Sequence, residues 1–265
     1  MKLSDIQDAI LNDAVKELTD ESVFLGVTEY GGGGAAPLTF VGSYSQVTTN
    51  GNTATFTYSN FTPETSGDTI QEGDLIICVF GRGNSSGYYV SNTPSEDDGN
   101  FTFIDGSKYS GNDSYDHDHA IFQKTVSAGE TSTTFNPDSL GTTSYQACAF
   151  VYLVFRNWTG VDQGQGSLGN NSSRYPSTGN NSTTNDSGNY IVYSHANGVY
   201  SSTYDVTTAA SNYDKLVGPV RGNDTDDINM STWIYQTDGT TWTNPAFTGT
   251  SSTSSDSTLV SIRVY

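Results

Sequence analysis

A segment in the middle of the chain gathers side chains that metal ions prefer. It reads Asp113-Ser114-Tyr115-Asp116-His117-Asp118-His119. In an extended segment, residues two apart point to the same side, so Asp116 and Asp118 would share one side and the two histidines the other. The carboxylate pair suits Ca²⁺ and the imidazole pair suits Zn²⁺, although no third strong ligand is identifiable. The alternative is a solvated loop in front of a strand that begins near His119.

Two further loops, 96–100 and 223–227, are acidic enough to be considered as calcium sites, and the second contains Asp224 and Asp226. Neither has the glycine at position 6 or the glutamate at position 12 of the helix–loop–helix calcium motif, and neither has helical flanks. Either loop could close around Ca²⁺. The alternative is a turn whose Asp and Asn side chains cap backbone groups. We expect no cofactor, with calcium left open.

Motifs for zinc-dependent hydrolysis and phosphate transfer are absent from the sequence. It contains no His-Glu-x-x-His and no Gly-x-x-x-x-Gly-Lys-Ser/Thr, and it has 3 histidines in all. Pairs of acids could be nominated for glycoside cleavage, but with 29 Asp and Glu residues such a pair carries no information. We therefore expect a protein without enzymatic activity.

Aromatic residues in polar surroundings suggest binding instead of catalysis. Tyr88, Tyr89 and Trp242 could stack on sugar rings while nearby Asn, Asp and Gln side chains bond to sugar hydroxyls. Trp233 and Tyr235 are two residues apart, so we expect them to share the core face of one strand. The first three residues are therefore the candidate glycan contacts.

The elements that would position these residues are strands. Period-two alternation and runs of β-branched or aromatic residues, separated by Gly, Asn, Ser and Asp turns, predict about eleven of them after residue 36. The runs 75–80 and 147–155 are apolar throughout, so we expect both to be central strands with both faces covered. Cys78 and Cys148 lie in these runs and should be free thiols packed as small apolar groups, because no secretory signal supports a disulfide.

The first thirty-five residues differ from the rest and predict a short N-terminal α-helix followed by a tether. Apolar residues recur at helical spacing, and Ser4 with Gln7 forms a capping box. Four glycines, 31–34, then form a flexible link. We expect residues 1–35 to dock on another protein, with self-association as an alternative, and residues 36–265 to form one β domain. The docking residues would be Leu3, Ile6, Ile10, Leu11, Ala14, Val15 and Leu18.

Composition restricts the partners further. The chain has 265 residues and a formal net charge of −19, which makes nucleic acid an unlikely partner on electrostatic grounds. The sequence has no run of 18 apolar residues, so we expect no membrane span. We therefore expect an acidic, mainly β protein. Its fold should be an antiparallel, jelly-roll-like β-sandwich preceded by a short N-terminal α-helix.

An ordered set of short motifs resembles the β-sandwich domains of tailed-bacteriophage virion proteins. The set covers about residues 39–162 and the C-terminal strand, and in order along the chain it comprises Gly73-Asp74-Leu75-Ile76-Ile77, Phe101-Thr102-Phe103-Ile104, Lys124-Thr125-Val126, Ala128-Gly129-Glu130 and Gly160-Val161-Asp162. Phe101 replaces the usual tryptophan, and the stretch 163–187 is an excursion that the family pattern lacks. The resemblance implies fold more firmly than role.

This resemblance implies a structural protein of the virion, synthesised in the host cytoplasm. The N-terminal segment would attach it to a capsid or tail component, and the sandwich would be displayed outward as a capsid decoration or as part of a tail fibre or knob. The alternative is a carbohydrate-binding adhesin or receptor-binding module that contacts a host surface glycan.

Overall fold

The structure, a computed structural model, describes residues 36–49, 53–83, 100–109, 117–137, 147–163, 168–171, 183–184, 186–198, 206–208, 213–222, 228–239, 241–242, 247–249 and 257–265. Contacts divide the chain into two units, Met1–Pro37 and Leu38–Tyr265, and every strand named below belongs to the second. The predicted helix and the glycine tether lie outside the described residues. Among those described, none belongs to a helix long and apolar enough to cross a membrane.

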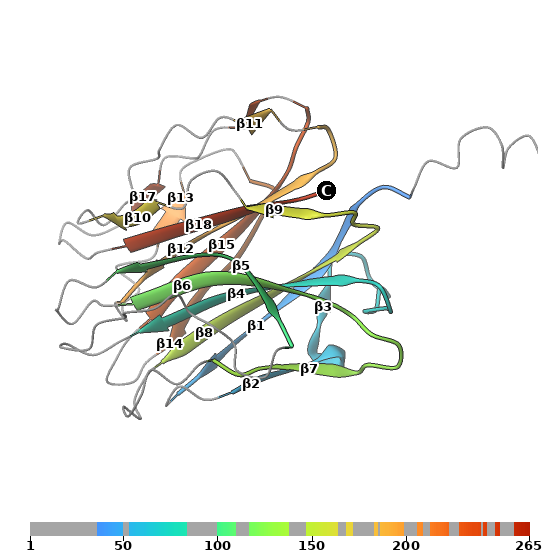
Figure 1. The fold of residues 1–265 in the computed structure, drawn as a ribbon, viewed down its shortest axis with the longest axis horizontal. Helices are drawn as coiled ribbons and strands as arrows, with labels where there is room; N and C mark the ends of the chain where they lie inside the picture. The colour runs from blue at the N-terminus through green and yellow to red at the C-terminus, as the bar shows by residue number, and fades with distance from the viewer. Residues whose placement is uncertain are drawn as a thin grey trace, which may run out of the picture. The chain divides into compact units, whose positions relative to one another are not determined.

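Six antiparallel strands form the first sheet (Figure 1). In spatial order they are β3 (Thr62–Pro63), β1 (Thr39–Thr48), β8 (Cys148–Arg156), β4 (Leu75–Gly83), β6 (His117–Thr125) and β5 (Thr102–Tyr109). β4 pairs with β8 on one side and with β6 on the other. The two apolar runs of the sequence are therefore adjacent strands at the centre of this sheet, as predicted.

Both faces of the central strands are buried. Each residue from Leu75 to Phe80 is at most 1% exposed, and each residue from Cys148 to Phe155 is fully buried. Successive side chains of a strand point to opposite faces, so a strand without polar residues needs a covering layer on each side. Cys78 and Cys148 are both free and buried on these neighbouring strands, which confirms the prediction for the two thiols.

The second sheet is also antiparallel and covers one face of the first. In spatial order its strands are β10 (Leu168–Asn171), β18 (Ser257–Val264), β12 (Tyr190–Asn197), β15 (Ile228–Gln236) and β14 (Lys215–Gly222), with β9 (Val161–Gln163) paired to β18. The largest apolar core lies between the two sheets. It joins Ile77 and Leu153 of the first sheet to Val192, Ile234 and other residues of the second.

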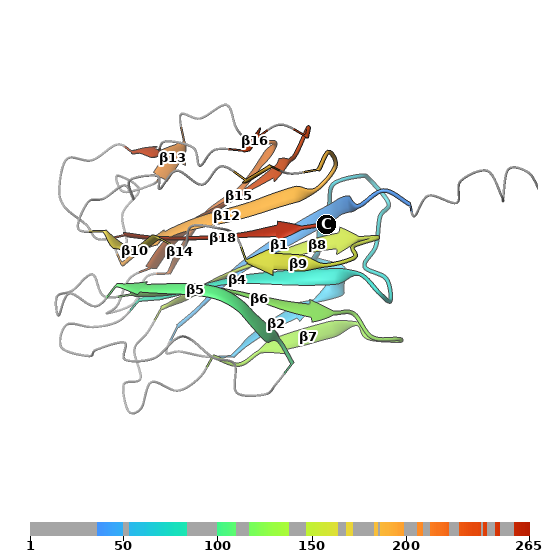
Figure 2. The same ribbon diagram turned by 45° about the horizontal axis from the view of Figure 1, so that its top comes forward.

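Three two-stranded ribbons complete the described part of the chain (Figure 2). They are β2 (Ala54–Thr57) with β7 (Ser132–Phe135), β11 (Thr183–Thr184) with β16 (Thr241–Trp242), and β13 (Val206–Thr208) with β17 (Phe247–Gly249). The β2–β7 ribbon covers the remaining face of the first sheet. Its Phe56 and Phe135 are fully buried in an aromatic core against Phe150 and Tyr152 of β8.

Helical structure among the described residues amounts to one short turn, η1 (Tyr58–Asn60), so the body is mainly β as predicted.

Several strands of the structure were not predicted from the sequence. β14 is interrupted by Gly218-Pro219 and contains the basic residues Lys215 and Arg221, which hides its alternation. β9, β10 and β11 arise within or beside the low-complexity stretch 163–187, where pairing partners rather than local preference create strands.

A bulge in β1 at Gly42 makes room for the aromatic ring of Phe61. The register of β1 against β8 shifts between Phe40 and Gly42, and Gly42 has φ of 153°. A Cβ atom at this position would lie 2.6 Å from Cζ of Phe61 and 2.8 Å from Cα of Pro63, and it would also collide with the carbonyl oxygen of Thr62. Only glycine fits because both the backbone angle and the space exclude a side chain.

We expect Gly42→Ala to lower the free energy of unfolding by about 3 kcal/mol, because the methyl group collides with rigid backbone as well as with Phe61. Urea denaturation measures this change. Gly129→Ala is the matched control: Gly129 also has positive φ (72°), but open space surrounds its missing side chain. Its cost should be about 1 kcal/mol, from backbone strain alone. Equal losses in the two variants would contradict the packing argument.

Candidate functional site

The predicted metal-binding segment is a buried strand rather than a loop where it is described. β6 begins at His117, and His117, Asp118 and His119 are each at most 1% exposed. The alternative of a solvated loop is therefore wrong for His117 and Asp118, whereas His119 lies in a strand as predicted. Asp116 lies outside the described residues. In the described part of the chain, no group of three or more His, Cys, Asp or Glu residues is arranged to hold a metal ion.

Asp118 is neutralised by a basic side chain of the neighbouring strand. Arg82 of β4 lies directly opposite it, and the Nε and Nη2 atoms donate to Oδ2 at 3.1 and 2.5 Å. Both side chains are 1% exposed, and the Arg82 guanidinium also lies 5.6 Å from the centre of the Phe80 ring. A buried carboxylate needs such a partner, because its desolvation is otherwise far too costly. The Asp118 charge is therefore balanced by Arg82 in the interior of the protein.

The two histidines of β6 link the two sheets. His117 Nε2 lies 3.0 Å from the Thr258 hydroxyl of β18, and His119 Nε2 lies 3.0 Å from the Ser194 hydroxyl of β12. The Thr258 hydroxyl also lies 3.2 Å from His119 Nδ1. The prediction that alternate residues of this segment share a side is confirmed for the histidine pair. These imidazoles connect layers in the interior.

One proton assignment satisfies this network. The Ser194 hydroxyl donates to the Ser231 carbonyl oxygen and accepts from Thr232, so His119 Nε2 must be a donor toward it. The Thr258 hydroxyl lies 3.2 Å from His119 Nδ1 and 3.0 Å from His117 Nε2. A neutral His119 therefore carries its proton on Nε2.

Burial lowers the pKa of His119 well below its ordinary value of 6.5, and the nearby His117 and His195 lower it further. Asp105 on β5 is affected in the opposite direction: burial raises the pKa of its carboxyl from 3.8 to about 6, although the backbone N–H of Gly106 donates to it at 2.9 Å. A fall in pH into the mildly acidic range therefore stabilises the folded state through protonation of Asp105 and destabilises it through His119.

Most other predicted site residues lie outside the described residues. They are Tyr88, Tyr89, Asp224, Asp226 and the seven docking residues of the N-terminal segment. Trp242 belongs to β16, where its backbone pairs with Thr183. Trp233 and Tyr235 lie on one face of β15 and pack with Tyr193 and Leu259 on the outer face of the second sheet, which confirms that they share a core face.

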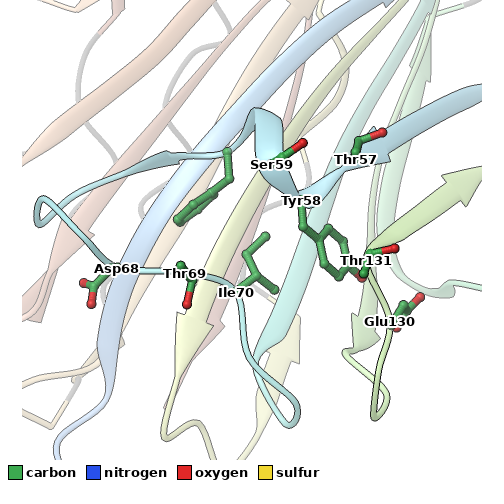
Figure 3. A pocket seen from close by; sticks show the side chains of 9 residues that line it. Thr57, Tyr58, Ser59, Asp68, Thr69, Ile70, Glu130 and Thr131 are labelled. Atoms are coloured by element: carbon green, nitrogen blue, oxygen red, sulfur yellow. The ribbon is translucent and has the colours of Figure 1, made fainter.

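A groove of about 420 Å³ opens beside the β2–β7 ribbon (Figure 3). One wall is the η1 turn, and the other is the loop between β3 and β4. Its lining combines apolar surface with hydroxyl and carboxylate groups. The lining residues are Thr57, Tyr58, Ser59, Phe61, Asp68, Thr69, Ile70, Glu130 and Thr131.

Hydrogen bonds hold the loop wall of the groove in place. Arg156 at the end of β8 donates to both carboxylate oxygens of Asp74 at 2.8 Å and to the Thr69 carbonyl oxygen at 2.7 Å. The indole N–H of Trp158 donates to the Gly73 carbonyl oxygen at 3.0 Å. A bidentate arginine is among the strongest fixed contacts available to a loop. The groove is therefore built on the rigid end of a central strand.

The η1 wall is fixed by the turn that precedes β7. The Tyr58 N–H donates to the Thr131 carbonyl oxygen at 2.9 Å, and the Tyr58 ring packs 5.3 Å from Phe56 in the aromatic core. Glu130 is held by Lys124 at 2.8 Å and by the Ser127 N–H at 2.9 Å. Burial and the adjacent Glu130 charge raise the pKa of Tyr58, so its phenol stays neutral.

No family model matches the sequence, and the comparisons with curated proteins and with solved structures found no match. The groove itself was not predicted from the sequence. The available signal was Gly67-Asp68 and Gly73-Asp74, two glycine-aspartate turns close together before a buried strand. What the sequence does not reveal is that Tyr58, far from Glu130 in the chain, lines the same groove.

The buried ion pair predicts a non-additive response to mutation. Asp118→Leu should lower the free energy of unfolding by about 4 kcal/mol, because it leaves the Arg82 charge buried without its main partner. Arg82→Met combined with Asp118→Leu should cost less than Asp118→Leu alone. Chemical denaturation of the single and double variants measures the coupling. The exposed pair of Lys215 and Glu64 provides the control, since Glu64→Gln should cost less than about 1 kcal/mol. Strictly additive losses at Arg82 and Asp118 would contradict this account.

The His119 pKa predicts acid sensitivity. The unfolded chain binds a proton at His119 below pH 6.5 and the folded chain does not, so stability falls with decreasing pH, approaching about 1.4 kcal/mol per pH unit. In His119→Gln this dependence should vanish while the contribution of Asp105 persists. The measurement is the difference in unfolding free energy between the two proteins from pH 7.5 to 5. Parallel profiles would show that His119 does not titrate as described.

Proposed function

We propose that this chain is a non-enzymatic structural protein of a tailed-phage virion, displayed on the particle surface as a capsid decoration or as part of a tail fibre or knob. The proposal includes the finer fold prediction, a jelly-roll-like β-sandwich over residues 36–265. It rests on the motifs of residues 39–162 that resemble virion domains, together with the antiparallel sheets into which those motifs fold.

The use of polar side chains inside the body supports the non-enzymatic part of this proposal. The side chains best suited to chemistry, His117, Asp118 and His119, serve as links between strands and sheets. In the described residues, the exposed large hydrophobic side chains are Val47, Phe103 and Tyr265, at 36–39% each. A rigid acidic body with scattered apolar exposure suits display in bulk water, because like charge keeps copies apart.

Attachment in this proposal belongs to residues 1–35. Leu3, Ile6, Ile10 and the apolar residues that follow would dock in a groove of a capsid or tail protein, and the tetraglycine link would let the body stand away from it. Synthesis takes place in the host cytoplasm, and the assembled virion is the final location.

A second candidate function is a carbohydrate-binding adhesin. One observation favours it: the groove of Figure 3 places aromatic and aliphatic surface next to hydroxyl and carboxylate groups, which is the combination that sugars require. Display on a particle and recognition of a host glycan are compatible, since the first uses the N-terminal segment and the second uses the body.

Removal of residues 1–30 tests the attachment. The shortened chain should remain folded by circular dichroism and should fail to co-sediment with assembled particles. Ile10→Asp should reduce incorporation strongly, because it places a charge on the apolar stripe, whereas Asn12→Asp on the opposite side should leave incorporation unchanged. Normal incorporation of the shortened chain would remove the attachment role from this segment.

A further inference from the structure

We propose that the groove between η1 and the β3–β4 loop binds a neutral pyranose ring, with Tyr58, Phe61 and Ile70 against its C–H face and Asp68 accepting from its hydroxyl groups. The inference rests on the second candidate function, to which it adds a site and a ligand class. It is independent of how the chain is attached to a particle.

The apolar part of the groove comes from three side chains that are only partly buried. Tyr58, Phe61 and Ile70 each pack against the aromatic core that covers one face of the first sheet, and each also lines the groove. A pyranose presents several C–H groups on one face, and this face prefers ring or aliphatic surface to water. The groove volume of about 420 Å³ falls within the range of small-molecule sites.

The polar part of the groove matches hydroxyl groups. Thr57, Ser59, Thr69 and Thr131 line it and can both donate and accept hydrogen bonds. Asp68 also lines it, and its backbone N–H is already bonded to the Thr65 carbonyl oxygen at 3.1 Å. A carboxylate is acceptor-only and therefore bonds well to adjacent sugar hydroxyls, which donate.

The charges around the groove favour a ligand without net charge. Glu130 is paired with Lys124 at 2.8 Å, and the Asp68 charge acts on Arg156, whose pKa it helps to raise. Each carboxylate thus has a basic side chain near it, which leaves little local attraction for a cation. The net charge of −19 repels an anionic sugar. A neutral sugar meets no such repulsion and needs no local charge.

The groove is also preorganised. Its loop wall is fastened by Arg156 and Trp158, and its other wall by the backbone bond from Tyr58 to Thr131. Asp74, which receives the two bonds from Arg156, is itself held by the N–H of Gln71 at 2.8 Å. A ligand that enters does not have to order these segments first, so less of the contact energy is lost on binding.

The test uses the full chain and saturation-transfer NMR with the methyl glycosides of glucose, galactose and mannose. Sialyllactose serves as the anionic probe and glucosamine as the cationic one. We expect binding of at least one neutral glycoside and weaker or no binding of the two charged probes. Tyr58→Leu should weaken that binding about tenfold by removing the ring face, and Asp68→Asn about fivefold by removing the charged acceptor.

Two matched variants control for indirect effects. Glu72→Gln removes an exposed carboxylate from the same loop without touching the groove lining, and Tyr235→Leu removes a half-buried tyrosine from the other sheet. Both should bind as the unmodified chain does, and thermal melting should show all four variants folded. Neutral-sugar binding that survives Tyr58→Leu and Asp68→Asn would overturn the site while leaving the adhesin role. Preferential binding of a charged probe would overturn the ligand class. Absence of binding to every probe at tens of millimolar would overturn both the site and the adhesin role.

Discussion

Both faces of the first sheet must be kept from water, and the other layers follow from this requirement. β4 and β8 carry apolar side chains on both sides, so neither face can serve as a surface. The second sheet covers one face and the β2–β7 ribbon covers the other. Each fully buried Ile, Val, Leu or Phe contributes about 1.5–3 kcal/mol through the hydrophobic effect, and the two apolar strands concentrate many such residues.

Polar side chains enter this interior only where a partner meets them. Asp118 faces Arg82 across one face of β6, and the two histidines on the opposite face meet hydroxyls of β12 and β18. Buried polar groups contribute specificity because only one register satisfies them, while a shift by one residue would leave a charge and two imidazoles unpaired. Residues that look catalytic or metal-binding in the sequence therefore fix the register of β6 against β4, through Asp118, and the fit of the two sheets, through the histidines.

The groove forms where the covering layer ends. The β2–β7 ribbon is shorter than the sheet beneath it, so at η1 the aromatic core reaches the surface, and Tyr58, Phe61 and Ile70 become partly exposed. Arg156 at the end of β8 fastens the neighbouring loop at the same place. The central strand thus supports both the core and the loop wall, which gives the groove a rigid base for recognition.

The sequence by itself determined the class of the body and the identity of its central strands. Alternation and apolar runs are local properties of the chain, because successive side chains of a strand point to opposite faces whichever strands lie beside it. These patterns therefore identify β1, β4, β8, β12 and β18. Only the tertiary structure decided what the polar residues do. Asp118 meets Arg82 across 36 positions, and His119 meets Ser194 across 75. Such partners depend on strand order and register, which arise from the packing of whole sheets and leave no local pattern in the chain. The groove is of the same kind, since Tyr58 and Glu130 come together only after β2 has paired with β7.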